Sequence, residues 1–223
     1  MDYTVSKITW HFKTLTAATK KALDLLSAEQ WLKRSQWYLA GGTALALQAG
    51  HRRSVDLDFF MQQANFNTAK LLEHFKKFQW QSTLIKEGTV YGILQGAKVN
   101  FITYPFFVPA APKHRYGAVR VLDARDIAVM KIIAISQRGR KRGFYDLYWY
   151  THTKEPLLNV LRRVHNQYPQ INHNYHHLLK SLVYFNDAEH DPTPKIFFQT
   201  SWKTIKKYFI SEVRQLTKSL LKL

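Results

Sequence analysis

The stretch Tyr38–Phe60, YLAGGTALALQAGHRRSVDLDFF, decides the fold. It places a Gly-Gly-Thr turn at 41–43 ahead of two carboxylates, Asp56 and Asp58, which stand two apart in an apolar run. Side chains alternate along a strand, so we expect both carboxylates to leave the same face. Two carboxylates in apolar surroundings are costly unless a positive group lies between them. Mg²⁺ sites use one or two carboxylates plus substrate phosphates, so the pair predicts a magnesium site.

The glycines add a second half to this site. Glycines at a strand-to-helix turn expose backbone N–H groups, which suit phosphate oxygens. Gly42 and Asp56 lie fourteen positions apart, which is enough for a turn, a short helix and a return strand. That path brings the glycine amides beside the carboxylates. Together the two features predict metal-dependent chemistry on a nucleoside triphosphate.

Composition limits the class of protein. With 223 residues, 46% of them hydrophobic, the chain can bury a core as one domain or as one domain with an appendage. It has no cysteine, which excludes disulfides and thiolate metal sites. No run has the length of a signal peptide or a membrane span, so we expect a cytoplasmic protein without membrane contact. The formal charge of +18 favours a nucleic-acid partner over a merely lysine-rich surface.

The order of elements predicts an α+β fold. Helices are expected at 4–35, at 44–49 with Thr43 as N-cap and Gly50 at the end, and from Asn67 or Thr68 to about 78. Strands are expected at 36–40, 55–61, 81–87, 90–95, 98–104 and 119–122, with Gly88 and Gly96 at hairpin turns. Asp123 should cap a helix over 127–137, and a basic loop at 138–143 should precede a helix at 144–150. Further helices are expected at 157–168, 175–185 and 202–221. We therefore expect a catalytic domain at 1–150 and a helical C-terminal segment at 151–223.

The ordered motifs resemble the AbiEii/AbiGii toxin family of the polymerase β-like nucleotidyltransferase superfamily. The resemblance spans roughly residues 36–150. The segments that carry it are GGTAL at 41–45, GHR at 50–52, SVDLD at 54–58, DIAVMK at 126–131 and RGRKRGFYDLY at 138–148. It implies a mixed-sheet nucleotidyltransferase fold flanked by helices. It also implies that Asp56 and Asp58 bind Mg²⁺ and the triphosphate.

Other residues receive roles from the motifs and from their charge. The resemblance implies that Lys131 contacts the nucleotide phosphates and that Asp146 is the aspartate that follows the basic loop. The catalytic candidates are therefore Asp56, Asp58, Lys131 and Asp146. Nucleotide or phosphate contacts are expected from Gly41, Gly42, Thr43, Ser54 and Arg52, and RNA contacts from Arg138, Arg140, Lys141 and Arg142.

Structural roles compete with these assignments. A lysine in the apolar helix around Lys131 either extends to solvent or meets an anion. Asp146 could form a salt bridge with Arg138 or Arg142, and Ser54 could be a plain strand-edge serine.

Two positions depart from the family pattern. Nucleotidyltransferases often carry a third acid on a later strand, but Asn100 stands at its expected place and cannot take a proton. Members of the toxin family often lack that acid too, so the role of base would pass to Asp58, Asp146 or solvent. Gly143 stands where the family usually has an aspartate. The loss of that negative charge could loosen the anchoring of Lys131 or Arg142. The two departures favour, as an alternative, a weakened or inactive homologue that only binds nucleotide or RNA.

The leading hypothesis is an Mg²⁺-dependent nucleotidyltransferase that moves an NMP from an NTP to an acceptor. The resemblance implies the toxin of a type IV toxin–antitoxin or abortive-infection pair, with a cognate antitoxin as partner. Some relatives act on the 3′ end of tRNA, and the positive charge fits an RNA acceptor independently. Transfer to a small molecule ranks lower, because a cationic acceptor would want an acidic cleft.

Overall fold

The computed structural model describes residues 8–220. A seven-stranded mixed sheet has the strand order β3-β4-β5-β2-β1-β7-β6. Its strands are β1 (Tyr38–Ala40), β2 (Leu57–Met61), β3 (Trp80–Lys86), β4 (Thr89–Leu94), β5 (Ala97–Thr103), β6 (His114–Tyr116) and β7 (Val119–Val121). The helices are α1 (Ala17–Ser27), α2 (Gln30–Arg34), α3 (Gly41–Ala49), α4 (Thr68–Glu73), α5 (Ala124–Gln137), α6 (Lys141–Thr153), α7 (Leu157–Gln167), α8 (Tyr175–Leu182), α9 (Asn186–Glu189) and α10 (Trp202–Leu220). The chain has the expected α+β class, with helices after the sheet.

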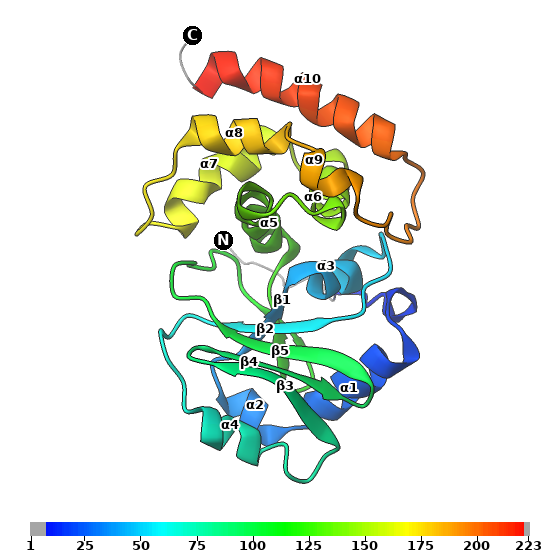
Figure 1. The fold of residues 1–223 in the computed structure, drawn as a ribbon, viewed down its shortest axis with the longest axis vertical. Coiled ribbons are helices and arrows are strands. Elements are labelled where there is room, and N and C mark those ends of the chain that lie inside the picture. Colours follow the sequence, from blue (N-terminus) through cyan, green and yellow to red (C-terminus); the bar gives the residue numbers. More distant parts are fainter. Residues whose placement is uncertain (1–7, 221–223) are drawn as a thin grey trace.

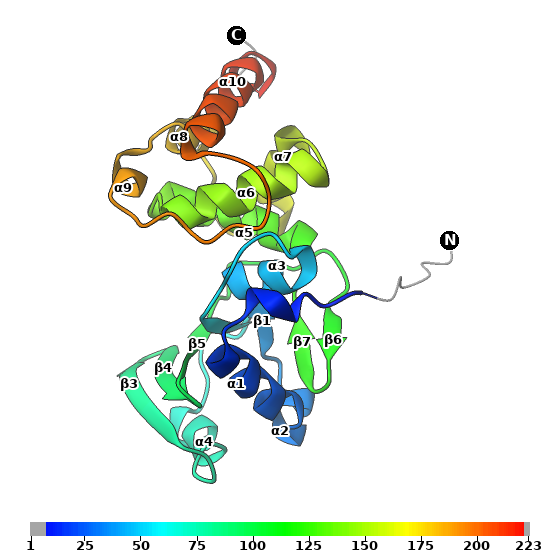
Figure 2. The same ribbon diagram turned by 90° about the vertical axis from the view of Figure 1, so that its right-hand side faces the viewer.

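Helices cover the sheet on one side and build a separate layer on the other (Figure 1). Helix α3 contacts β1 and β2 on its lower side and α5 and α6 on its upper side. Its residues 43–47 are all buried, as expected for a helix that is apolar all round. Helices α5 and α6 pack against α8 and α10 in the upper layer, and Figure 2 shows the same stacking from the side. Helix α3 therefore links the sheet to the helical layer.

The centre of the sheet fixes the register of the acidic strand. β2 runs antiparallel to β1 and parallel to β5, and Asp58 pairs with Ala40 on one side and Asn100 on the other. The burial of β2 alternates along its five residues, with Leu57, Phe59 and Met61 buried. Their insertion into the core leaves Asp58 and Phe60 on the opposite face.

The hairpin prediction is confirmed. Strands β3, β4 and β5 form an antiparallel meander, and Gly88 and Gly96 have φ of 64° and 77° at its two turns. Positive φ is the conformation that glycine adopts without a steric cost. Gly50, also at positive φ, ends α3 as expected.

Several predicted boundaries were wrong. Residues 4–7 of the long N-terminal helix lie outside the described residues, and 8–16 contain a 3-10 turn at Phe12–Thr14 and a β-bridge from Leu15 to Ser54, with no α-helix. Thr16 instead caps α1, its hydroxyl accepting from the Thr19 N–H, and Glu29 separates α1 from α2. Helix α4 is shorter than predicted, and β6 and α9 were missed because both have only three or four residues.

Candidate active site

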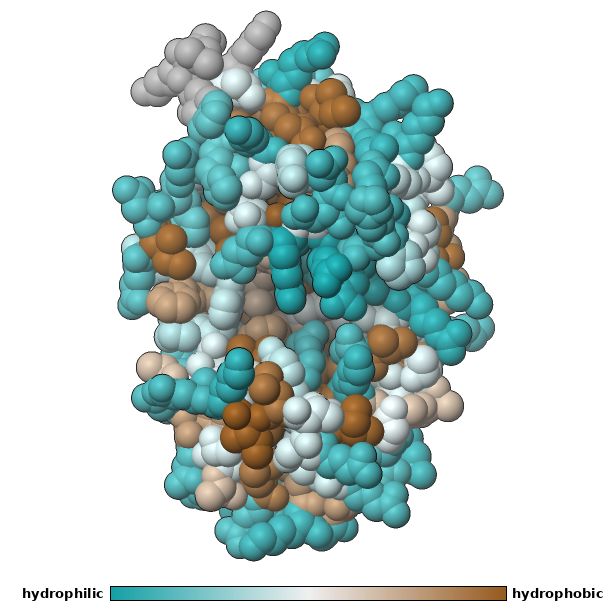
Figure 3. Space-filling view, in the orientation of Figure 1, coloured by the Kyte–Doolittle hydropathy of each residue, from teal (hydrophilic) through white to brown (hydrophobic). Residues whose placement is uncertain are grey.

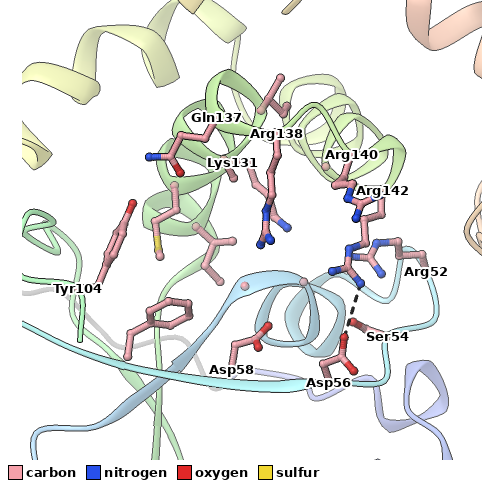
Figure 4. A pocket seen from close by; sticks show the side chains of 18 residues that line it. Arg52, Ser54, Asp56, Asp58, Tyr104, Lys131, Gln137, Arg138, Arg140 and Arg142 are labelled. Carbon is pink, nitrogen blue, oxygen red and sulfur yellow. Dashed lines mark ion pairs between the residues drawn. The ribbon is translucent and has the colours of Figure 1, made fainter. Parts of the chain in front are cut away.

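A pocket of about 220 Å³ lies between the start of α3, the segment that enters β2, and helices α5 and α6. Its carboxylates come from the sheet side, and Lys131, Arg138, Arg140 and Arg142 come from the helical side, as Figure 4 shows. Arg52 comes from the segment between α3 and β2. The residues of predicted function that line it are Gly41, Gly42, Arg52, Ser54, Asp56, Asp58, Lys131, Arg138, Arg140 and Arg142. The structure thus brings together residues from Gly41 to Arg142, which are 101 positions apart in the chain.

The two acidic residues lie on one side of the pocket. β2 begins at Leu57, so Asp56 precedes the strand and only Asp58 belongs to it, unlike the prediction of a strand from residue 55. Asn100 donates a hydrogen bond from Nδ2 to Asp58 Oδ1 at 2.8 Å. Burial, reinforced by the charge of Asp56, raises the pKa of Asp58 above its usual value. Asp56 faces Arg142, whose Nη1 is 3.6 Å from Oδ2. A cation between the carboxylates would relieve the cost of burying them.

The glycine turn starts α3 earlier than predicted. The helix begins at Gly41, whose φ of 73° turns the chain directly from β1 into the helix. A Cβ on Gly41 would lie 3.1 Å from Asp58 Oδ2, and one on Gly42 would lie 2.3 Å from Arg52 Nη2. Both glycines therefore let the pocket groups approach the backbone closely.

Thr43 has a different position from the one predicted. It lies inside the first turn of α3 and is not its N-cap, because the helix already begins at Gly41. Its buried hydroxyl donates to Ser54 Oγ at 2.8 Å and makes a short contact with the carbonyl oxygen of Asp56. Thr43 does not line the pocket; it holds the segment that carries Ser54 and Asp56 in place.

Asp146 is fully buried behind the pocket and gathers three basic side chains. Arg52 donates from Nε and Nη2 to its two oxygens at 2.5 and 2.9 Å, and Lys131 Nζ lies 2.6 Å from Oδ2. His51 Nε2 lies 2.7 Å from Oδ1. The alternative salt bridge of Asp146 with Arg138 or Arg142 is not formed. Asp146 instead holds Arg52 and Lys131 where both line the pocket.

Charges decide the protonation of this cluster. Burial favours the neutral form of Asp146, but Arg52 and Lys131 outweigh it and hold the pKa of that carboxyl well below its usual range. Burial lowers the pKa of His51, more than the hydrogen bond to Asp146 raises it. The carboxylate can only accept, so neutral His51 donates from Nε2. His51 was quoted in the GHR motif but given no role; its apolar neighbours Trp149 and Phe198 are far away in sequence.

The basic loop is shorter than predicted, because α6 begins at Lys141. Arg138, Arg140 and Arg142 are exposed, and Arg138 extends into the pocket from above the carboxylates (Figure 4). Lys141 does not fit the predicted RNA contact. It is 6% exposed, and its ammonium donates to the carbonyl oxygens of Glu189 and Asp191 at 3.2 and 2.6 Å.

Gly143, the second departure from the family pattern, lies on α6 where this helix faces α5. A Cβ there would lie 3.4 Å from Ile135 Cγ1, where α5 and α6 pack closely. Lys131 is held by Asp146 at 2.6 Å, and the effect of glycine at 143 on the anchoring of Lys131 or Arg142 stays a prediction.

An apolar wall closes the other end of the pocket and was not predicted. It consists of Phe60, Tyr104, Ile127 and Met130, and the rings of Phe60 and Tyr104 meet edge to face at 5.7 Å. The signal for Phe60 was present in the sequence, since it follows Asp58 by two positions in a strand. Tyr104 had the same kind of signal, since it stands four positions after Asn100 in the strand predicted at 98–104, although β5 itself ends at Thr103.

The mixed sheet, the glycine-started helix and the adjacent aspartates define the class of protein: this is a nucleotidyltransferase fold. Residues 24–218 match the family model described as nucleotidyl transferase AbiEii toxin, type IV TA system. The chain belongs to this family, and it is therefore a nucleotidyltransferase of a toxin family.

One curated relative and two solved structures are similar to the chain. The chain is 31% identical over 188 residues to an uncharacterised protein of Aquifex aeolicus strain VF5, covering 81% of this chain and 88% of the relative. Its fold is similar to that of MenT4, a nucleotidyltransferase toxin from Mycobacterium tuberculosis H37Rv, with a TM-score of 0.58, 16% identity and coverage of 91% and 86%. A candidate nucleotidyltransferase from Helicobacter pylori has a TM-score of 0.53, 14% identity and coverage of 93% and 98%. Within residues 8–220, no helix is long and apolar enough to cross a membrane.

Proposed function

We propose that the protein transfers an NMP from an NTP to the 3′ end of an RNA, with tRNA as the leading candidate, and that the reaction depends on Mg²⁺. The observation that supports this proposal best is the meeting of Asp56 and Asp58 with Lys131 and Arg52 across one pocket. Acids on one wall suit metal ions, and cations on the other suit a triphosphate.

The donor set fits magnesium. Asp56 and Asp58 offer carboxylate oxygens to the pocket. Asp58 Oδ2 lies close to Gly41, on the side where any other residue would carry its Cβ. Among residues 8–220, no group of three or more acids or histidines is placed to hold a metal ion. Phosphate oxygens and water would complete the coordination, as Mg²⁺ commonly requires. When bound, the metal would neutralise the triphosphate charge and polarise the phosphorus that is attacked.

The protein's own residues would bind and orient the nucleotide. Lys131 and Arg52, held by Asp146, would contact the phosphates, and Gly41 and Gly42 would let them approach the first turn of α3. The wall around Phe60 and Tyr104 would pack against the nucleobase.

In the transfer, a hydroxyl oxygen of the acceptor bonds to the α-phosphorus, and the bond from that phosphorus to the pyrophosphate oxygen breaks. Asp146 is excluded as the base, because it is buried and bound to three basic side chains. The acceptor proton would therefore pass to Asp58 or to solvent.

Family membership also supports a wider role. The type IV toxin–antitoxin description implies a cognate antitoxin as partner, and the substrates would place the protein in the cytoplasm.

A second candidate function is binding without catalysis. The observation that favours it is Asn100, which hydrogen-bonds Asp58 where many relatives of the superfamily carry an acid.

The test is incubation of the purified protein with each labelled NTP, Mg²⁺ and total tRNA. We expect label on tRNA with the wild type, and a loss of at least about a hundredfold in Asp56→Asn and Asp58→Asn variants that stay folded. Nucleotide binding by calorimetry without any transfer would favour the binding-only function. If the wild type labels neither RNA nor another acceptor with any NTP, the proposed transfer is wrong.

A further inference from the structure

A second hollow opens beside the active-site pocket. Its volume is about 310 Å³, and it shares Ile135, Gln137 and Arg138 with the pocket. Its other wall is formed by α8 and the residues that follow it. The two hollows therefore meet at the end of α5, and Arg138 lies at their junction.

The wall from α8 presents one face of a helix. His177, Lys180 and Ser181 belong to α8, and the last two stand three and four positions after the first, which places them on the same side of the helix. Tyr184 follows two positions after the end of α8 and lines the same hollow. His177 and Lys180 are exposed, and Tyr184 is 50% exposed although it is a large aromatic residue. Nothing in the assigned function uses these side chains.

The charges of the second hollow favour an anion. Within residues 8–220, neither Arg138 nor Lys180 forms an ion pair with an acid. Asp187 is the one carboxylate among the residues that line it. Figure 3 shows hydrophilic side chains gathered across the middle of this face, between the sheet and the upper helices. Two free cations beside one acid leave the hollow positive.

Cations combined with an exposed ring are the features that bind single-stranded nucleic acid. Lysine and arginine contact successive phosphates, and an aromatic ring stacks on an unpaired base. We propose that this second hollow binds the single-stranded 3′ end of the RNA acceptor. Arg138 and Lys180 contact its phosphates, Tyr184 stacks on a base, and the terminal nucleotide reaches the aspartates through the shared edge. This inference rests on the proposed transfer to RNA.

The test measures binding of a fluorescent single-stranded RNA and of tRNA by anisotropy over a range of salt concentrations. It uses the full chain carrying Asp58→Asn, so that turnover is prevented. The variants are Lys180→Ala, Tyr184→Ala and Tyr184→Phe. Lys33→Ala is the matched control, because Lys33 is an exposed lysine on α2, at the opposite end of the molecule.

Lys180→Ala should weaken RNA binding several-fold and reduce the slope of log affinity against log salt by about 0.7, the value for one phosphate contact on a single strand. Tyr184→Ala should weaken binding by about fivefold or more, while Tyr184→Phe keeps the ring and the affinity. Lys33→Ala should change neither quantity. In the active protein, the same variants should raise the KM for tRNA and leave the affinity for NTP with Mg²⁺ unchanged.

Unchanged RNA affinity and salt slope in both Lys180→Ala and Tyr184→Ala would overturn the inference, even if the wild type transfers NMP to tRNA. Loss of binding to an acidic protein partner with unchanged RNA affinity would also overturn it, since the hollow would then be a protein-binding surface. If RNA binding depends on these residues but no transfer to RNA occurs, the site stands and the proposed transfer fails.

Discussion

At the scale of single residues, the pocket depends on one carboxylate that does not reach it. Asp146 touches no open space, yet it sets the positions of Lys131 and Arg52, which do. Burying an acid together with its cations costs free energy of desolvation. Removing the acid alone costs more, because it leaves positive charges buried without a counter-charge. The Asp146 cluster is therefore the point at which stability and activity are most closely coupled.

Asp146→Asn should lower the free energy of unfolding by about 3–5 kcal/mol. It should also release Lys131 and Arg52 from the positions in which they line the pocket. Urea unfolding at pH 7 measures the first effect, and the affinity for NTP measures the second. Glu73→Gln is the control: Glu73 pairs with Lys76 at the surface, where an ion pair contributes only about 0–1 kcal/mol. Equal stabilities of Asp146→Asn and the wild type would show that the cluster contributes nothing to folding.

The same residue predicts how stability depends on pH. The folded-state pKa of Asp146 lies well below the ordinary value of 3.8, so its contribution is complete above 3.8 and is lost as the pH falls from there through the folded pKa. The stability gap between the wild type and Asp146→Asn should therefore narrow below pH 3.8. His51 has a lowered pKa, so acidification below its ordinary value of 6.5 should destabilise the wild type separately. A gap that is constant down to pH 2 would contradict the role of Asp146.

At the scale of elements, the start of α3 joins the fold to the site. Gly41→Ala puts a Cβ at φ of 73°, which costs about 1–2 kcal/mol, and brings it 3.1 Å from Asp58 Oδ2. Gly96→Ala has nearly the same strain at φ of 77°, but its Cβ meets only Ala18 at 3.7 Å. We expect similar losses of stability in thermal unfolding, and a drop in transfer of roughly a hundredfold for Gly41→Ala alone. Matching activities in the two variants would mean that Gly41 serves only the turn.

Elements also show what the sequence could predict. Asp56, Asp58 and the hairpin glycines were found because local spacing and turn chemistry decide their positions. The start of α3 was predicted too late because threonine is a favoured N-cap residue, which made Thr43 the expected cap. The helix in fact begins two positions earlier, at Gly41, which has a positive φ. The partners of Asp146 could not be predicted, since His51 and Arg52 meet it only through packing of α3 against α6. Lys141 was misassigned for the same reason: nothing near it in the sequence indicates that Asp191 folds back onto it.

At the scale of the whole molecule, the predicted division at residue 150 raises the question of whether the part before it can fold without the helices that follow. Helix α6 (Lys141–Thr153) spans that position. Phe144 on α6 is fully buried, and its ring meets those of Phe185, Trp202 and Phe209 at 5.3 to 5.6 Å. The helices after 153 therefore complete the core into which α5 and α6 are packed. The C-terminal segment is a covering layer of the same core, and the division at 150 remains a prediction about sequence organisation.

A chain ending at residue 155 tests this dependence. Removing α7 to α10 exposes the faces of α5 and α6 that contact these helices, and each large apolar side chain returned to water costs roughly 1.5–3 kcal/mol. A few such side chains equal the whole stability of an ordinary domain, about 5–15 kcal/mol. We expect the shortened chain to lose the cooperative thermal transition of the full chain and to bind the dye ANS. A cooperative transition near that of the full chain would show that residues up to 155 fold alone. The helices after 155 would then serve the binding of RNA or a partner and would not be needed for stability.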